Sequence, residues 1–143
     1  VRVEAFSVKH GQLQALAYKF ITEDRTIVIS GDTAPVPIMV EKAMNADILL
    51  HECEYTAGLS QRSEQWQIYH RNVHTMSVDL AEIAKKAHPK LLVTYHRIYH
   101  MNIQDNTADL AHEMDIRNQK ILEEIQDAGY EGKVVNGQDL DVF

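Results

Sequence analysis

Alternating and continuous apolar runs divide the first part of the chain into short strands. Residues 1–8 alternate between apolar and polar positions, which predicts a half-buried strand. Residues 13–20 are mostly apolar on both faces and predict a second, more central strand. Ile27-Val28-Ile29 is a third run, buried and β-branched. Because turns at 9–11 and 22–25 separate these runs, we expect an antiparallel meander.

Helical spacing alternates with buried strands through the rest of the chain. The pattern predicts helices over 38–45, 76–87 and 107–128, and buried strands over 47–52 and 91–96. Gly129 is expected to end the last helix. Residues 53–72 show weak periodicity and predict a long loop. Residues 133–136 and 140–143 predict a hairpin around Asn136-Gly137.

Polar residues stand where three of the buried runs end. Asp32 follows the first of them through Ser30-Gly31, the second ends in His51-Glu52 and the third in His96. Strand–helix alternation makes these strands neighbours, so their tips should lie at one sheet edge. His74, just before the 76–87 helix, should face the same edge. Asp and His are ligands for zinc or a similar divalent ion, although Asp32 as a simple turn cap is the alternative.

Composition narrows the class of protein. The 143 residues are 45% hydrophobic, enough for one globular domain. A net charge of -7 argues against a broad nucleic-acid surface, but leaves room for a small phosphate-binding spot. The single cysteine, Cys53, excludes an internal disulfide. No apolar run reaches the ~20 residues of a membrane span and no signal peptide is evident, which favours the cytoplasm. Because the sequence opens at Val1 in strand-like residues, we expect an N-terminal portion to be missing.

Four motifs together resemble a known family. They are Ser30-Gly31-Asp32-Thr33-Ala34-Pro35, Ala46-Asp47-Ile48-Leu49-Leu50-His51-Glu52, His74-Thr75, and Leu91-Leu92-Val93-Thr94-Tyr95-His96. In this order and spacing they resemble the C-terminal half of a metallo-β-lactamase-fold hydrolase, of the branch with ribonuclease Z and arylsulfatase-like enzymes. The resemblance implies an α/β chain: a mixed sheet with flanking helices, half of a four-layer αββα sandwich. Residues 1–143 would be a single domain whose N-terminal metal-ligand half is absent.

The resemblance also implies roles for four residues. Asp32 matches the aspartate that bridges two metal ions, and His96 matches the last metal-ligating histidine. His74 matches a histidine that transfers a proton or stabilises an oxyanion, and Glu52 matches a glutamate that orients it. The implied cofactor is a pair of divalent ions, zinc first, with manganese or iron as alternatives.

The implied reaction is hydrolysis of an ester or phosphodiester by a metal-activated water. Two alternatives stay open: a tRNA 3′-processing endonuclease of the ribonuclease Z type, and a non-catalytic half-domain that pairs with another chain. The family's His-x-His-x-Asp-His motif does not occur here. His96 is followed by Arg97-Ile98-Tyr99 rather than a Phe-Ser-x-Arg-Tyr-like run, which favours small or undefined esters. We therefore expect weak metal binding and no ester hydrolysis from this chain alone.

Other residues and partners complete the expectations. His10 is interpreted as a turn histidine, with a supporting position near the substrate as the alternative. His51 is interpreted as a residue that packs or that supports the metal ligands, and Cys53 as a small buried residue. His70, His100 and His112 are expected on the surface, and Trp66 and Tyr69 either line a substrate pocket or anchor a loop. Since the strands are apolar on both faces, the partner is the missing N-terminal half or a second copy, as in a homo-oligomer. The other partner is a small-molecule substrate; no membrane is expected, and nucleic acid is not favoured.

Overall fold

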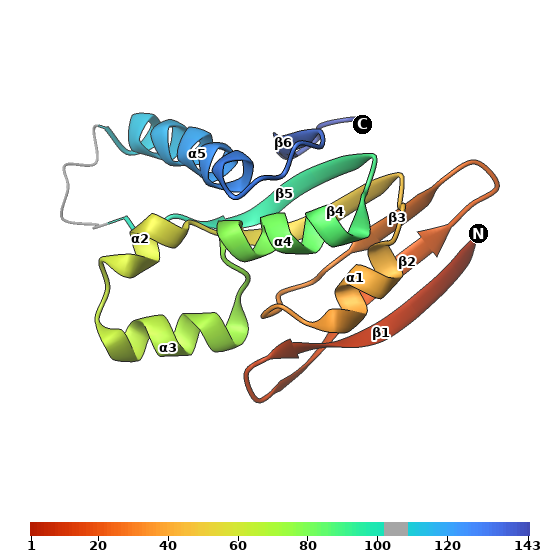
Figure 1. Cartoon of the computed structure of the whole chain (residues 1–143), viewed down its shortest axis with the longest axis horizontal. Helices are drawn as coiled ribbons and strands as arrows, with labels where there is room; N and C mark the ends of the chain where they lie inside the picture. The colour runs from red at the N-terminus through yellow and green to blue at the C-terminus, as the bar shows by residue number, and fades with distance from the viewer. Residues whose placement is uncertain (102–108) are drawn as a thin grey trace.

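Six strands of the described residues form one mixed sheet, and they lie in the sheet in the order in which they occur along the chain (Figure 1). The computed structural model describes residues 1–101 and 109–143. The strands are β1 (Arg2–His10), β2 (Leu13–Ile21), β3 (Thr26–Ile29), β4 (Ile48–Glu54), β5 (Leu91–Ile98) and β6 (Val134–Asn136). The helices are α1 (Pro37–Ala43), α2 (Thr56–Ser60), α3 (Glu64–Val73), α4 (Ser77–Ala87) and α5 (Leu110–Asp127).

The sheet has an antiparallel half and a parallel half. β1, β2 and β3 pair antiparallel through short turns, which confirms the predicted meander. β3, β4, β5 and β6 pair parallel, and helices connect them. The carboxyl ends of β3, β4 and β5 therefore meet at one edge, as the alternation of strands and helices predicts.

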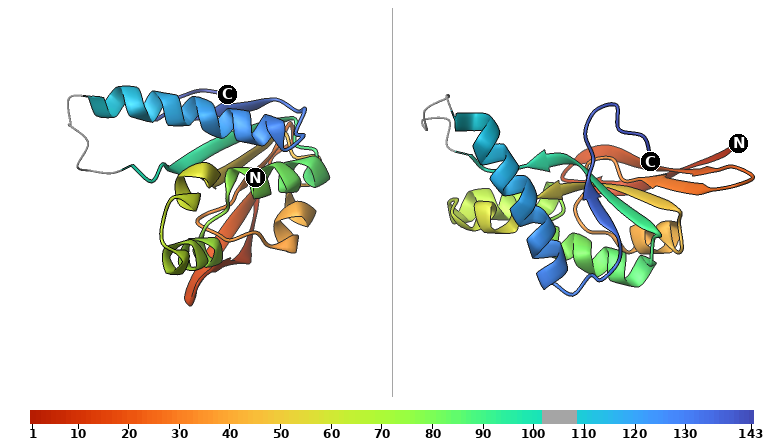
Figure 2. Two further views of the ribbon diagram at one scale, coloured as in Figure 1. Left: turned by 60° about the vertical axis from the view of Figure 1, so that its left-hand side comes forward. Right: turned by 90° about the horizontal axis from the view of Figure 1, so that it is seen from above.

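One face of the sheet is covered by helices. Val28, Leu49 and Leu92, from three neighbouring strands, are fully buried and belong to one core cluster. The helix residues that pack in the same cluster include Met39 of α1, Leu80 of α4 and Ile121 of α5. Figures 1 and 2 show α1 and α4 against the strands on this side. Among residues 1–101 and 109–143, no helix combines the length and apolarity that a membrane crossing requires.

The predicted loop at 53–72 is wrong, because most of it is helical. α2 and α3 occupy this stretch, and Ser63 caps α3 by accepting a hydrogen bond from the Trp66 amide. The helix was missed because Trp66, Ile68 and Tyr69 are about half exposed and give no regular apolar stripe. Burial of Val73 and His70, on the other side, holds α3 in place.

The predicted C-terminal hairpin is also wrong. β6 adds to the sheet edge parallel to β5, with Val134 opposite Leu92, and residues 140–143 form no strand. A parallel partner at the sheet edge replaces the hairpin that the Asn136-Gly137 dipeptide suggested. The predicted helix over 107–128 is observed as α5, and Gly129 ends it at φ 88°. Residues 107 and 108 lie outside the described residues.

In the part of the chain that the structure describes, the second face of the sheet carries apolar side chains without helices over them. Alternation from Ala17 and Val28, which are buried on the helix side, places Leu16, Tyr18 and Ile29 on this open face. Leu16 and Tyr18 are 46% and 40% exposed. Further members of the open face, by strand register, are Val3, Phe20, Ile27, Ile48 and Leu50.

We predict that the open face makes the chain associate. A large apolar side chain gains about 1.5–3 kcal/mol on full burial, so several left in water forfeit an amount comparable with the ~5–15 kcal/mol stability of a typical domain. Light scattering should report a species larger than the monomer at micromolar concentration. The double substitution Leu16→Lys and Tyr18→Lys should shift it toward monomer.

Met44 provides the control for this prediction. It is 45% exposed and follows α1, on the helix side of the sheet. Met44→Lys should leave the association unchanged. A wild-type chain that stays monomeric, unfolds cooperatively and binds no hydrophobic dye would contradict the prediction.

Candidate active site

A tight turn after β3 presents Asp32 at the sheet edge. The Ser30 amide continues the ladder by donating to the Leu50 carbonyl at 3.0 Å. Gly31 then adopts φ 60°, and a Cβ at this position would lie 2.6 Å from the Leu16 carbonyl oxygen. Only glycine fits such a close backbone approach in the left-handed region. The backbone path that leads to Asp32 therefore requires the glycine before it.

A β-bulge aims His96 at the same place. The β4–β5 register pairs Glu52 with Tyr95 and Cys53 with Arg97, so His96 is the extra residue in β5. Its φ of 43° is uncommon for a non-glycine residue. Bulges kink a strand and re-aim a side chain, and they occur often beside active sites.

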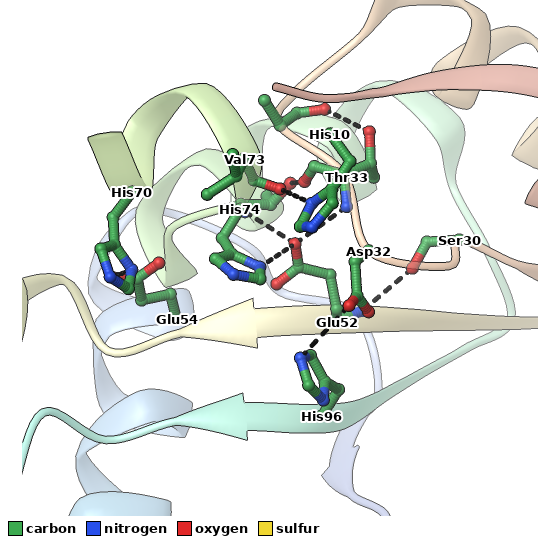
Figure 3. A network of polar contacts seen from close by, with 12 residues as sticks. His10, Ser30, Asp32, Thr33, Glu52, Glu54, His70, Val73, His74 and His96 are labelled. Atoms are coloured by element: carbon green, nitrogen blue, oxygen red, sulfur yellow. Dashed lines mark hydrogen bonds and ion pairs between the residues drawn. The ribbon is translucent and has the colours of Figure 1, made fainter. Parts of the chain in front are cut away.

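Asp32 and His96 meet across the strand ends (Figure 3). The Asp32 Oδ2 and His96 Nε2 atoms are 3.5 Å apart, and the side chains are 40% and 47% exposed. Metal–ligand bonds of about 2.0–2.2 Å allow one divalent ion to bind both atoms at this separation. The predicted convergence at one edge is thus observed, and the two residues fit a metal. Their roles as ligands stay a prediction.

The buried Glu52 carboxylate joins the loops around the site. Its Oε1 atom accepts hydrogen bonds from the Thr33 and Thr75 amides, each at 3.1 Å. The same atom lies 3.1 Å from His74 Nδ1, which donates to it (Figure 3). Oε2 is buried and has no hydrogen-bond partner among the described residues. Glu52 therefore holds His74 beside the Asp32 loop, and the catalytic roles of the two residues stay a prediction.

The pKa values of both Glu52 and His74 are raised, so the pair binds its proton more firmly than the free side chains would. Burial raises the pKa of the Glu52 carboxyl, against the opposing effect of the His74 hydrogen bond. Burial alone would lower the pKa of His74, but the hydrogen bond and charge of Glu52 outweigh it, so this pKa is raised. With Nδ1 turned to Glu52, the Nε2 atom of His74 is the one that can exchange a proton with a substrate.

His51 and His10 support this arrangement from two sides. Burial lowers the pKa of His51 to about 4, so its ring is neutral, and Nδ1 donates to the Glu52 carbonyl at 2.7 Å. This agrees with its predicted packing role. His10, at the end of β1, donates from Nδ1 to the Val73 carbonyl at 2.8 Å and packs edge-on against His74. His10 thus has more than the turn role predicted for it.

Cys53 is not arranged as a nucleophile. Its side chain is fully buried in the core cluster, as predicted. Burial raises the pKa of the thiol well above its usual value, so the reactive thiolate is suppressed.

The predicted surface positions of His70 and His100 are wrong. Only 9% and 4% of their side chains are exposed, and both approach the fully buried carboxylate of Glu54. A buried carboxylate needs polar or cationic partners, and the two histidines are buried because they contact Glu54. The spacing of residues in the sequence does not predict this contact. His112 on α5 is exposed, as predicted.

A pocket opens next to these histidines. It is lined by Arg62, Ser63, Trp66, His70, Ile98, Tyr99, His100 and Met101. Trp66 therefore lines a pocket, and whether that pocket binds substrate stays a prediction. The Arg62 guanidinium donates to the His100 and Met101 carbonyls and fixes the pocket wall.

Curated relatives match part of the chain. Ribonuclease BN from Proteus mirabilis is 36% identical over 72 residues, which are 50% of this chain and 22% of that protein. Ribonuclease Z from Ignicoccus hospitalis is 35% identical over 79 residues, 55% of this chain and 24% of that protein. The matched stretch is thus well under half the length of these relatives. No family model matches the chain.

Solved structures match nearly the whole chain. The metallo-β-lactamase fold protein YhfI from Bacillus subtilis superposes with a TM-score of 0.68 at 18% identity, over 95% of this chain and 46% of that one. The short form of human tRNase Z gives 0.62 at 20% identity, over 99% and 42%. These likenesses confirm the mixed-sheet fold and, with the sequence matches, the resemblance to part of a metallo-β-lactamase-fold hydrolase of the ribonuclease Z branch.

We predict that Glu52→Gln lowers the pKa of His74. The substitution removes the opposing charge and leaves burial, which disfavours the imidazolium. The pKa of His74 should therefore fall. NMR titration of the metal-free chain, with a chelator present, measures this shift, and the exposed His112 serves as an internal control in the same spectra. An unchanged His74 titration would mean that Glu52 does not control its proton.

Proposed function

We propose that the protein that contains this chain is a metal-dependent hydrolase of an ester or phosphodiester. The observation that carries the proposal is the convergence of Asp32 and His96, 3.5 Å apart, beside the buried Glu52–His74 pair. The Asp32–His96 pair, which suits a divalent ion, and the Glu52–His74 pair, which suits proton transfer, lie at the same edge of the sheet. This is the arrangement that a hydrolytic site with a metal-activated water needs.

Asp32 and His96 would hold zinc, or manganese or iron in its place. When bound, the metal would lower the pKa of water and polarise the scissile group. Two ligands are too few to hold a catalytic ion tightly, since such sites use three or more protein ligands. We propose that this chain is the C-terminal portion of a sandwich, and that the other portion packs on the open face and supplies the remaining ligands.

His74 acts on the proton of the leaving group. Glu52 accepts from Nδ1 and so fixes the ring, which leaves Nε2 to donate. The raised pKa of His74 favours the protonated ring, which is the form that donates. In its protonated form the same ring can stabilise a developing oxyanion.

A phosphodiester is the substrate class that the relatives favour. Relatives that match this chain are named ribonucleases BN and Z. The net charge of -7 and the sequence after His96 argue for smaller substrates. RNA is therefore the first phosphodiester to test, alongside small aryl esters and phosphodiesters.

Substitutions in the protein that contains this chain test the proposal. His74→Ala should lower kcat about 10²–10⁴-fold, the usual contribution of a general acid, with little change in KM. Asp32→Ala should abolish the metal-dependent turnover. The assay uses bis(p-nitrophenyl) phosphate, p-nitrophenyl acetate and a precursor tRNA with a 3′ trailer, each with zinc or manganese.

His112→Ala, on the exposed side of α5, is the matched histidine control and should keep turnover unchanged. Cleavage of the tRNA at its 3′ end would identify the endonuclease alternative, and cleavage of only the small substrates would exclude it. If Asp32→Ala and His74→Ala both retain wild-type turnover, or no substrate is cleaved, the proposed function is wrong.

A further inference from the structure

A second cluster of ligand-type side chains lies apart from the Asp32–His96 pair. Glu54 ends β4, His70 lies on α3, and His100 follows β5. One ligand atom from each residue lies within 4.8 Å of the other two. Figure 3 shows Glu54 and His70 together, on the far side of His74 from Asp32.

The polar atoms of this cluster are poorly satisfied by hydrogen bonds. Glu54 is fully buried, and its Oε2 atom has no hydrogen-bond partner in the described part of the chain. His70 Nδ1 is also buried, and its contact is the Glu54 Oε1 atom at 2.9 Å. Burying a carboxylate oxygen without a hydrogen-bond partner is costly. His100 Nε2 contacts the same Glu54 oxygen, so two ring nitrogens point at one carboxylate.

We propose that Glu54, His70 and His100 bind a zinc-class divalent cation. Two imidazoles and a carboxylate are a ligand set that zinc uses with one coordination position left open. With metal–ligand bonds of about 2.0–2.2 Å, three atoms within 4.8 Å of one another are close enough to share one ion. The cation neutralises the buried Glu54 carboxylate, whose Oε2 atom has no hydrogen-bond partner among the described residues.

The pocket supplies the open position. His70 and His100 both line it, together with Trp66 and Tyr99, so water or an oxygen atom of a small molecule can approach the ion. The left-handed backbone of His100, at φ 56°, is a further sign of a constrained position. The bound cation ties β4, α3 and the segment after β5 together, and α3 leads directly to His74.

Zinc binding to the 143-residue chain tests the site, with cobalt as a spectroscopic probe. After unbound metal has been removed by dialysis, we expect one cation per chain. With cobalt, we expect absorption bands in the visible range that are typical of a site with four or five ligands. The double substitution Asp32→Ala and His96→Ala should leave this binding in place. In that background, His70→Gln or His100→Gln should weaken it at least tenfold, and Glu54→Gln likewise.

His112→Gln and His88→Gln, which alter histidines outside the cluster, are the controls and should keep wild-type affinity. If the cluster variants fail to fold, cobalt-induced shifts in the NMR spectrum of the wild-type chain decide: His70 and His100 should be affected more strongly than His96. The proposal is overturned if the chain retains no metal, if the Asp32–His96 double variant loses it, or if cluster variants bind it as the wild type does. Loss of turnover in the hydrolase assay would not affect this result, because the readout is metal binding.

Discussion

The candidate active site depends on one buried carboxylate. Glu52 has no exposed surface, so its charge must be satisfied by protein groups. Its Oε1 atom accepts hydrogen bonds from the amides of Thr33 and Thr75 and from the ring of His74. The Glu52 amide in turn donates to Ser30 Oγ, next to the turn that carries Asp32. Without this carboxylate, the two loops that contain Thr33 and Thr75 would lose their common hydrogen-bond acceptor. The distance between His74 and the Asp32–His96 pair would then no longer be fixed.

Sequence patterns predict the frame of the site better than its lining. Asp32 and His96 could be placed at one edge because parallel strands connected by helices must align their carboxyl ends. The β-bulge that turns His96 toward Asp32 could not be foreseen, since it is set by the register between two strands distant in sequence. α3 and the burial of His70 were missed for a similar reason. Their position follows from a tertiary contact with Glu54, which no local periodicity encodes.

The same alternation that builds the core also decides where the site opens. Val28 and Leu49 point to the helices, so Leu50 and Glu52 lie on the opposite side of the sheet. That side is the open face, with Leu16 among its exposed apolar residues. The candidate active site and the uncovered apolar surface therefore share one side of the molecule. The partner proposed for this face would therefore also border the site, where it would both remove the apolar surface from water and complete a ligand set.

Two carboxylates two residues apart on β4 link the two clusters. Glu52 and Glu54 lie on the same side of the strand, and each approaches histidines from the α3 region or beyond: His74 for the first, His70 and His100 for the second. The charge of Glu54 also contributes to the raised pKa of His74, after the larger effects of burial and of Glu52. A cation bound at Glu54 would offset that charge and so loosen the hold of His74 on its proton. Because the rings of His70 and His74 are also in contact, with centroids 5.6 Å apart, the two clusters are coupled electrostatically and through packing along a single turn of helix.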